Sequence, residues 1–300
     1  MSKLDDVAGK YGIEYIDHLT RYNDIKTFHI YNNGKLTEEL NDISLLNDNT
    51  PIHFTEYIAG TLVRIIFIDD DFFIGHNADI IHARGDRIIK DDFVIPTYTG
   101  ITNFLNKFSP MENRIICIYG VVFGNGFNDS ERYTSENKTS FRMFDGFSIS
   151  LDTVQTLFTK LSLEELDKWT NDGHRSLWSF NTLRNFYNRF QVQGVPEIWD
   201  GPFSNFPKDP TRLMNWGKNA LDSDVKLDEK VVHTNEDFTM DAGDDFLPDI
   251  KGEESAKQVK EPEKPTKKSS KYGIAKGMVI RSEDSKYIRK VIFENGYINL

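Results

Sequence analysis

The sequence predicts an α+β domain of mostly antiparallel sheets flanked by helices. Short runs of β-branched and aromatic residues are concentrated in the first half of the chain, where Asp69-Asp70-Asp71 separates two of them. Segments with helical spacing follow, and two further strand-like runs stand near the end. This mixed order, with antiparallel hairpins near the start and two strands at the end, is typical of the α+β class.

Strands are expected where apolar residues run together between turn-forming residues. In the first half of the chain these runs cover residues 52–57, 62–68, 72–75, 114–120 and 140–150. Residues 277–281 and 287–293 give two more. The triple aspartate predicts a hairpin turn rather than a metal site, because Asp tolerates turn geometry.

Helices are expected at residues 101–108, 152–161 and 162–169. Ser162 and Glu165 have the spacing of a capping box, which marks the start of the third helix. An aromatic stripe at helical intervals predicts a further helix that faces a core rather than a base-stacking platform. Its members are Phe180, Leu183, Phe186, Tyr187 and Phe190.

Composition indicates one domain interrupted by a charged segment. The chain has 300 residues, 38% of them hydrophobic, which is enough to bury a sizeable core. Between Asp222 and Pro265, 14 acidic and 6 basic side chains supply most of the net charge of −11. We therefore expect residues 1–220 and 271–300 to form a single domain, with a disordered acidic insertion at 221–270.

The same composition limits the partners and the compartment. Net negative charge argues against sequence-blind binding to nucleic acid, although the chain outside the insertion is nearly balanced and leaves room for a local basic groove. No secretory signal or membrane-length apolar run is present, so we expect a cytoplasmic protein without a membrane partner. Cys117, the single cysteine, stands in an apolar run, which predicts a buried thiol.

Six short segments in a fixed order carry the functional information. They are Glu56-Tyr57-Ile58-Ala59-Gly60-Thr61, Phe73-Ile74-Gly75-His76-Asn77-Ala78, Tyr119-Gly120-Val121-Val122-Phe123-Gly124, Phe141-Arg142-Met143-Phe144-Asp145, Ala275-Lys276-Gly277-Met278-Val279-Ile280-Arg281 and Ile288-Arg289-Lys290-Val291-Ile292. Together these segments resemble the nucleotidyltransferase domain of ATP-dependent RNA ligases. The corresponding family motifs include Glu-Lys-x-x-Gly-Thr, Tyr-Gly-Glu-x-x-Gly, Phe-x-x-Phe-Asp and Ala-Glu-Gly-x-Val-Ile-Arg. The resemblance covers residues 50–150 and 272–296, with a looser match at Gly194-Val195-Pro196.

The resemblance implies the ligase fold but not the ligase chemistry. In the family, a lysine amine attacks the α-phosphorus of ATP, and Mg²⁺ offsets charge on the phosphates. Tyr57 stands at the lysine position, and no lysine lies between Lys35 and Lys90. Val121 and Lys276 stand where family carboxylates bind or orient Mg²⁺. We therefore expect these three catalytic positions to be inactive and no metal to be bound.

Other positions keep residues suited to a nucleotide. The resemblance assigns nucleotide binding to Glu56, Gly60, Arg64, His76, Phe144 and Lys290, with His76 at the position of a sugar-contacting arginine. Phe144 or Phe141 takes the place of the aromatic side chain that sandwiches adenine in the family. Arg281, Arg64, Lys276 and Lys290 are candidates for local positive charge, and Lys276 for an ion pair with Glu56 or Asp145.

Three functions remain open on this basis. The leading hypothesis is a catalytically inactive RNA ligase homologue that binds ATP or another nucleotide, an RNA end or a protein partner. The second is an active ATP-dependent RNA ligase with an atypical, Mg²⁺-dependent site. The third is an interaction protein that keeps the fold as a shape and recruits a protein partner through residues 221–270. The chain ends at Leu300, soon after the last motif, so we expect no C-terminal RNA-gripping domain.

Overall fold

The computed structural model describes residues 3–23, 25, 27–28, 46–68, 71–77, 83–84, 87–88, 97, 104, 113–124, 127, 139–205 and 277–292. Three expectations lie outside these residues. They are the insertion at 221–270, the helix at 101–108 except for Phe104, and the position of Lys276.

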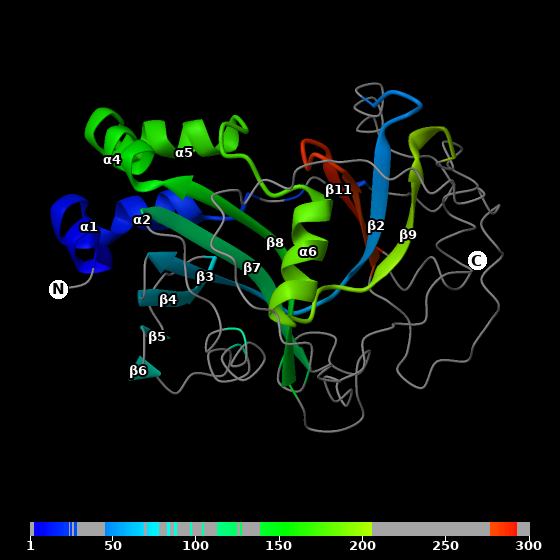
Figure 1. Ribbon diagram of the computed structural model, residues 1–300, viewed down its shortest axis with the longest axis horizontal. Coiled ribbons are helices and arrows are strands. Elements are labelled where there is room, and N and C mark those ends of the chain that lie inside the picture. The colour runs from blue at the N-terminus through cyan, green and yellow to red at the C-terminus, as the bar shows by residue number, and fades with distance from the viewer. Residues whose placement is uncertain are drawn as a thin grey trace.

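Two sheets form the framework of the protein (Figure 1). The six-stranded sheet has the order β6-β5-β4-β3-β7-β8, and all of its neighbouring strands are antiparallel. Its strands are β3 (Thr61–Ile68), β4 (Asp71–His76), β5 (Ala83–Arg84), β6 (Arg87–Ile88), β7 (Arg114–Gly124) and β8 (Thr139–Ser150). Ile68 pairs with Asp71, so the expected hairpin at the triple aspartate is confirmed.

The five-stranded sheet has the order β1-β11-β10-β2-β9. Its strands are β1 (Thr27–Phe28), β2 (Pro51–Tyr57), β9 (Glu197–Pro202), β10 (Gly277–Ser282) and β11 (Ile288–Ile292). β1 pairs with β11 in parallel, and the other pairs are antiparallel. This sheet brings the start and the end of the sequence together, because β2 pairs directly with β10.

The described helices begin in different ways, since the side chains of Ser150, Ser162 and Ser179 cap three of them, whereas Gly12 precedes another without a side-chain cap. They are α1 (Lys3–Tyr11), α2 (Ile13–Thr20), α4 (Leu151–Lys160), α5 (Leu163–Asn171) and α6 (Phe180–Phe190), with a 3₁₀ turn, η3, at Phe203–Asn205. Ser162 and Glu165 form the expected capping box at the start of α5. None of the described helices is both long and apolar enough to span a membrane.

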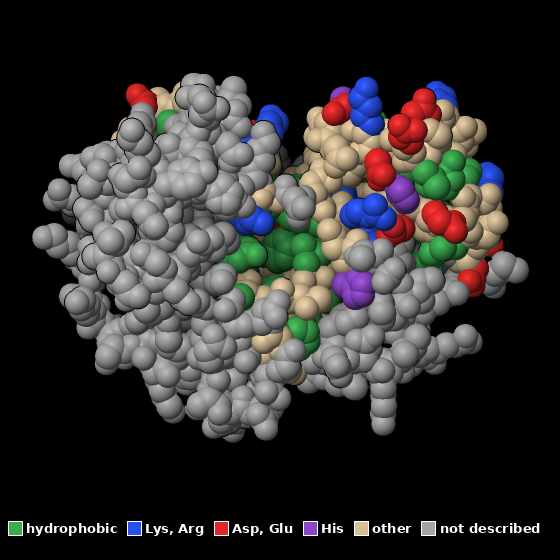
Figure 2. All heavy atoms as spheres, turned by 180° about the vertical axis from the view of Figure 1, so that it is seen from behind, with side chains coloured by type: hydrophobic (Ala, Val, Ile, Leu, Met, Phe, Trp, Pro, Cys, Tyr) green, Lys and Arg blue, Asp and Glu red, His purple; other side chains and the backbone are tan. Residues whose placement is uncertain are grey.

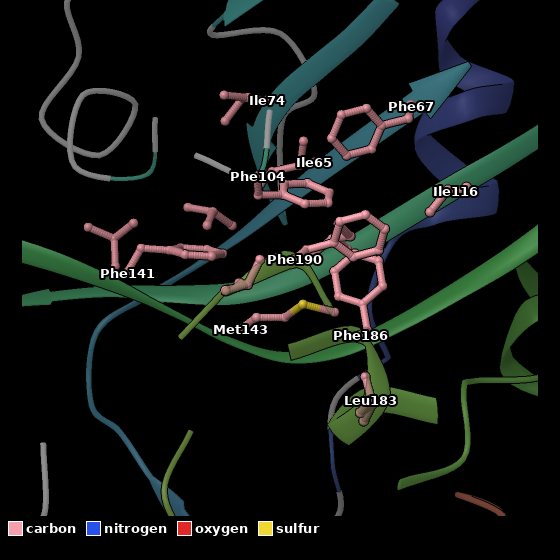
Figure 3. Close-up of a cluster of buried hydrophobic side chains, with 14 of the residues drawn as sticks. Ile65, Phe67, Ile74, Phe104, Ile116, Phe141, Met143, Leu183, Phe186 and Phe190 are labelled. Carbon is pink, nitrogen blue, oxygen red and sulfur yellow. The ribbon is translucent and has the colours of Figure 1, made fainter. Parts of the chain in front are cut away.

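The hydrophobic core lies on both faces of the six-stranded sheet. On one face, the expected aromatic stripe of α6 packs against β3, β4, β7 and β8, and the rings of Phe186 and Phe190 lie 4.8 Å apart (Figure 3). On the other face, α1, α2, α4 and α5 cover the sheet. Cys117 is fully buried in β7, as expected, and burial raises the pKa of its thiol to about 12.

Several elements of this framework were not expected from the sequence. They are the helices α1 and α2, the strands β1, β5, β6 and β9, and the turn η3. Leu19 and Ile16 of α2 are completely buried against the sheet, so the N-terminal helices are part of the core.

The close approach of two strands requires glycine at position 60. A Cβ atom at Gly60 would lie 2.2 Å from the backbone oxygen of Val122 and 2.8 Å from a methyl carbon of Val121. We expect Gly60→Ala to lower the free energy of unfolding by about 1–3 kcal/mol, because backbone must move to make room. Urea denaturation measures this change.

Gly9→Ala is the matched control, since no atom lies within 4 Å of a Cβ added at Gly9 in α1. This substitution should leave stability unchanged or raise it by up to about 1 kcal/mol, through helix propensity. Equal effects at the two glycines would contradict the strand contact at Gly60.

Candidate functional site

A cavity of about 340 Å³ lies between the two sheets. It is lined by residues of β2, β3, β7, β8, β10 and β11, and by the segment that follows α2. On the side opposite to that of Figure 1, the surface is hollowed, with hydrophobic side chains on the floor and Lys or Arg side chains beside them (Figure 2). Four of the expected binding residues line the cavity: Glu56, Gly60, Phe144 and Lys290.

Tyr57, at the end of β2, also lines the cavity. Lys290 of β11 places its Nζ atom 5.8 Å from the centre of the Tyr57 ring, within the range of a cation–π contact. The two residues are brought together because β10 pairs with both β2 and β11. At the position where the resemblance placed a lysine, the structure has a phenol ring beside an amine from another strand.

Val121 forms an apolar wall of the cavity. It is 7% exposed and packs in a cluster with Ile58, Ala59 and Phe123, against which Val195 also lies. Mg²⁺ requires oxygen ligands, and these side chains offer none. Val121, where the resemblance placed a carboxylate, is therefore part of a small hydrophobic core.

Phe144 reaches the cavity because β8 contains a β-bulge. Tyr119 pairs with Asp145 and Gly120 with Met143, which leaves Phe144 without a partner on β7. The Phe144 ring meets the ring of Tyr22 edge to face, with centroids 5.2 Å apart.

Phe141, the alternative stacking residue, does not line the cavity. Its side chain is 1% exposed and belongs to the core beneath α6. Its ring covers Gly120, where an added Cβ would lie 2.2 Å from a ring carbon. Of the two aromatic residues considered, only Phe144 is placed to contact a ligand.

A buried polar network joins the two sheets beside the cavity. Arg281 of β10 forms an ion pair with Asp145 of β8, and the Tyr22 hydroxyl donates a hydrogen bond of 2.9 Å to the same carboxylate. The Gly146 N–H donates to the other oxygen at 2.8 Å. Burial raises the pKa of Asp145 above its usual value, and Arg281 opposes this shift. Burial also raises the pKa of Tyr22 well above its usual value.

Arg64, expected to bind the nucleotide, is placed elsewhere. Its side chain is completely buried under α2, where the guanidinium forms an ion pair with Asp17 and donates to the Thr20 hydroxyl at 3.0 Å. Its charge is therefore used to hold the helix on the sheet. Arg281 is likewise paired with a carboxylate, although it lines the cavity.

His76 does not line the cavity, but its neighbour Asn77 does. The Asn77 side chain accepts a hydrogen bond from the Tyr22 N–H and donates one to the Tyr22 carbonyl, at 2.8 and 3.0 Å. This pair of bonds fixes the segment after α2 at the cavity. Sequence reasoning missed both residues, because Asn77 stood unassigned in a motif and Tyr22 lies in no motif.

The lining residues favour an aromatic ligand that carries an anionic group. Among the described residues that line the cavity, Glu56 is the only carboxylate, while Arg281 and Lys290 are cationic. Phe144, Tyr22 and Tyr57 supply aromatic surface on which a planar base can stack. Among these lining residues, only Glu56 could give a divalent ion a carboxylate oxygen.

Comparison with known proteins identifies the fold. The chain matches no protein-family model and no curated protein sequence. It is similar in structure to Naegleria gruberi RNA ligase, both a mutant in the apo form and the ligase with PPi, each with a TM-score of 0.50 and 11% identity. Each match covers 94% of this chain, which spans 57% and 58% of the respective ligase chains. The protein therefore has the α+β nucleotidyltransferase fold of RNA ligases.

Removing the carboxylate of the buried network should destabilise the protein strongly. Asp145→Asn leaves Arg281 buried without its counter-charge, so we expect a loss of about 3–5 kcal/mol in the free energy of unfolding. Asp172→Asn, at an exposed position, should change it by less than about 0.5 kcal/mol. Urea denaturation of both variants measures the difference. A loss below about 1 kcal/mol for Asp145→Asn would show that the pair does not hold the sheets together.

Proposed function

We propose that this protein binds a nucleotide, free or at the end of an RNA, in the cavity between its sheets, without forming the covalent intermediate of RNA ligases. The observation that carries this proposal is the contrast between two walls of one cavity. One wall presents Phe144, Tyr22 and Lys290, which suit a base and a phosphate. The other presents Val121 in an apolar cluster where the ligase family has a carboxylate.

Nucleophilic attack on phosphorus is unfavourable at Tyr57. A phenol has a reference pKa near 10, so at neutral pH it is mostly protonated unless strong cationic help is present. Lys290 lies over the Tyr57 ring, within the range of a cation–π contact with its π electrons. Tyr57 in this arrangement acts as a binding surface.

The proposed mode of binding predicts how the affinity for a nucleotide depends on its number of phosphates and on Mg²⁺. Glu56 is the only carboxylate in the described lining, so we expect a metal ion to bridge the β- and γ-phosphates of ATP to the protein only weakly. AMP and ATP should then bind with similar affinity, and Mg²⁺ should change either dissociation constant by less than about threefold. A catalytic ligase site would instead favour ATP with the metal.

Calorimetric titration of the purified protein with AMP, ATP and a short 5′-phosphorylated RNA tests the proposal. Phe144→Leu should weaken binding by about tenfold, because base stacking on an aromatic ring contributes about 1–3 kcal/mol. Lys290→Met should weaken it by a similar factor, through loss of the phosphate contact. Comparison of AMP with the RNA distinguishes a free nucleotide from an RNA end as the ligand.

Lys286→Met is the matched control for Lys290, since the side chain of Lys286 is 85% exposed and lies outside the cavity lining. The Lys286→Met variant should bind AMP, ATP and the RNA with the same affinity as the unmodified protein. The proposal is rejected if none of the three ligands binds, or if Phe144→Leu and Lys290→Met bind as tightly as the control.

A further inference from the structure

A second polar cluster lies at the opposite end of β2 from Tyr57, where the five-stranded sheet meets the N-terminus of α6. His53 of β2 is at its centre, and the ring of His53 stacks on Phe180 of α6 with centroids 4.1 Å apart. Glu197 and Asp200 come from the neighbouring strand β9, and Glu283 from the turn between β10 and β11. The cluster thus gathers four separate elements around one imidazole.

The orientation of the His53 ring is fixed from one side. Its Nε2 atom lies 2.8 Å from Oε2 of Glu283, and the other Glu283 oxygen accepts a hydrogen bond of 2.9 Å from the Asn181 N–H. In this geometry Nε2 carries the proton and donates to the carboxylate. The lone pair of a neutral His53 is then on Nδ1.

Nδ1 of His53 points at acceptors rather than donors. It lies 3.5 Å from Oε1 of Glu197, and it makes no hydrogen bond with any residue that the structure describes. The His53 side chain is only 6% exposed, so bulk water does not solvate this atom freely. A buried acceptor beside a carboxylate is unfavourable, so a cation between them, either a proton on Nδ1 or a metal ion, stabilises the pair.

One ligand atom from each of His53, Glu197 and Asp200 can be chosen so that all lie within 4.8 Å of one another. Tetrahedral ligands at about 2.1 Å from one ion lie about 3.4 Å apart, so the carboxylates must move inward by up to about 1.4 Å to bind a single metal ion. Asp200 is 61% exposed, which leaves the outer side of the cluster open to water ligands. An imidazole that donates its second N–H to a carboxylate is the usual arrangement at protein metal sites.

Arg184 of α6 supplies positive charge to the same carboxylates. Its guanidinium forms an ion pair with Glu197 and lies 3.7 Å from Asp200. The Arg184 side chain is 36% exposed, so it can turn toward solvent without leaving a buried charge. It therefore competes with any other cation for Glu197 and Asp200.

We propose that His53, Glu197 and Asp200 form a binding site for Zn²⁺, with Glu283 orienting the imidazole. Zinc is preferred because the ligand set combines one imidazole nitrogen with carboxylate oxygens, whereas Mg²⁺ binds through oxygen alone. The zinc site is separate from the proposed nucleotide-binding cavity, because none of the three zinc-binding residues lines that cavity. Phe180, on which His53 stacks, does line it, so the two sites are neighbours.

Competition for Zn²⁺ against a chromophoric chelator, with the full chain, tests this site. The unmodified protein should bind one Zn²⁺ and should show no comparable affinity for Mg²⁺. Asp200→Asn removes an exposed ligand without disturbing the core, and should weaken binding by about tenfold or more. Glu283→Gln should weaken it by about 10–100-fold, because the ring loses its orienting carboxylate. Arg184→Met should bind Zn²⁺ more tightly than the unmodified protein, since the competing cation is gone.

Asp172→Asn, at an exposed acid away from the cluster, is the control and should bind as the unmodified protein does. His53→Gln should abolish Zn²⁺ binding. If this substitution at a buried residue prevents folding, the affinity of Asp200→Asn for Zn²⁺ tests the proposal instead. Failure of the protein to bind Zn²⁺ overturns the proposal. So does an affinity that Asp200→Asn leaves unchanged, or one that Arg184→Met lowers.

Discussion

The buried ion pair between Arg281 and Asp145 fixes how the two sheets of this protein meet. Arg281 belongs to β10 and Asp145 to β8, and the Tyr22 hydroxyl adds the segment after α2 to the same carboxylate. Taking two charges out of water costs several kcal/mol each, so such a pair contributes more to a unique geometry than to net stability. Here that geometry is the shape of the cavity, which both sheets and the Tyr22 segment enclose.

In the proposed function, the cavity has residues that bind a nucleotide and lacks those that react with it. Gly60 allows β3 to approach β7 closely, and the bulge in β8 turns Phe144 into the cavity. The side chains of Val121 and Tyr57 both make contacts with their surroundings. Val121 packs in its own apolar cluster, and Tyr57 lies against Lys290. A carboxylate at position 121 would have to be buried among apolar side chains, which is costly without a partner.

Local patterns predicted most of the framework and only part of the site. The strands at β2, β3, β4, β7, β8, β10 and β11, and the capped helices α4 and α5, follow from short-range periodicity and capping residues. Phe144 was identified from its motif, but its choice over Phe141 depends on a bulge that no local pattern reveals. Arg64 was misplaced because its partner Asp17 lies 47 positions away on a helix with a weak signal. Tyr22 was missed for a related reason, because it follows α2, a helix that the sequence analysis did not predict.

The most direct test of this account is an intact-mass spectrum of the protein after incubation with ATP and either Mg²⁺ or Mn²⁺. If Tyr57 and Val121 stand where the resemblance places the family lysine and a metal-orienting carboxylate, the mass should equal that of the unmodified polypeptide under both conditions. A covalent AMP adduct on any residue of the cavity would contradict the central claim that this ligase fold binds without reacting.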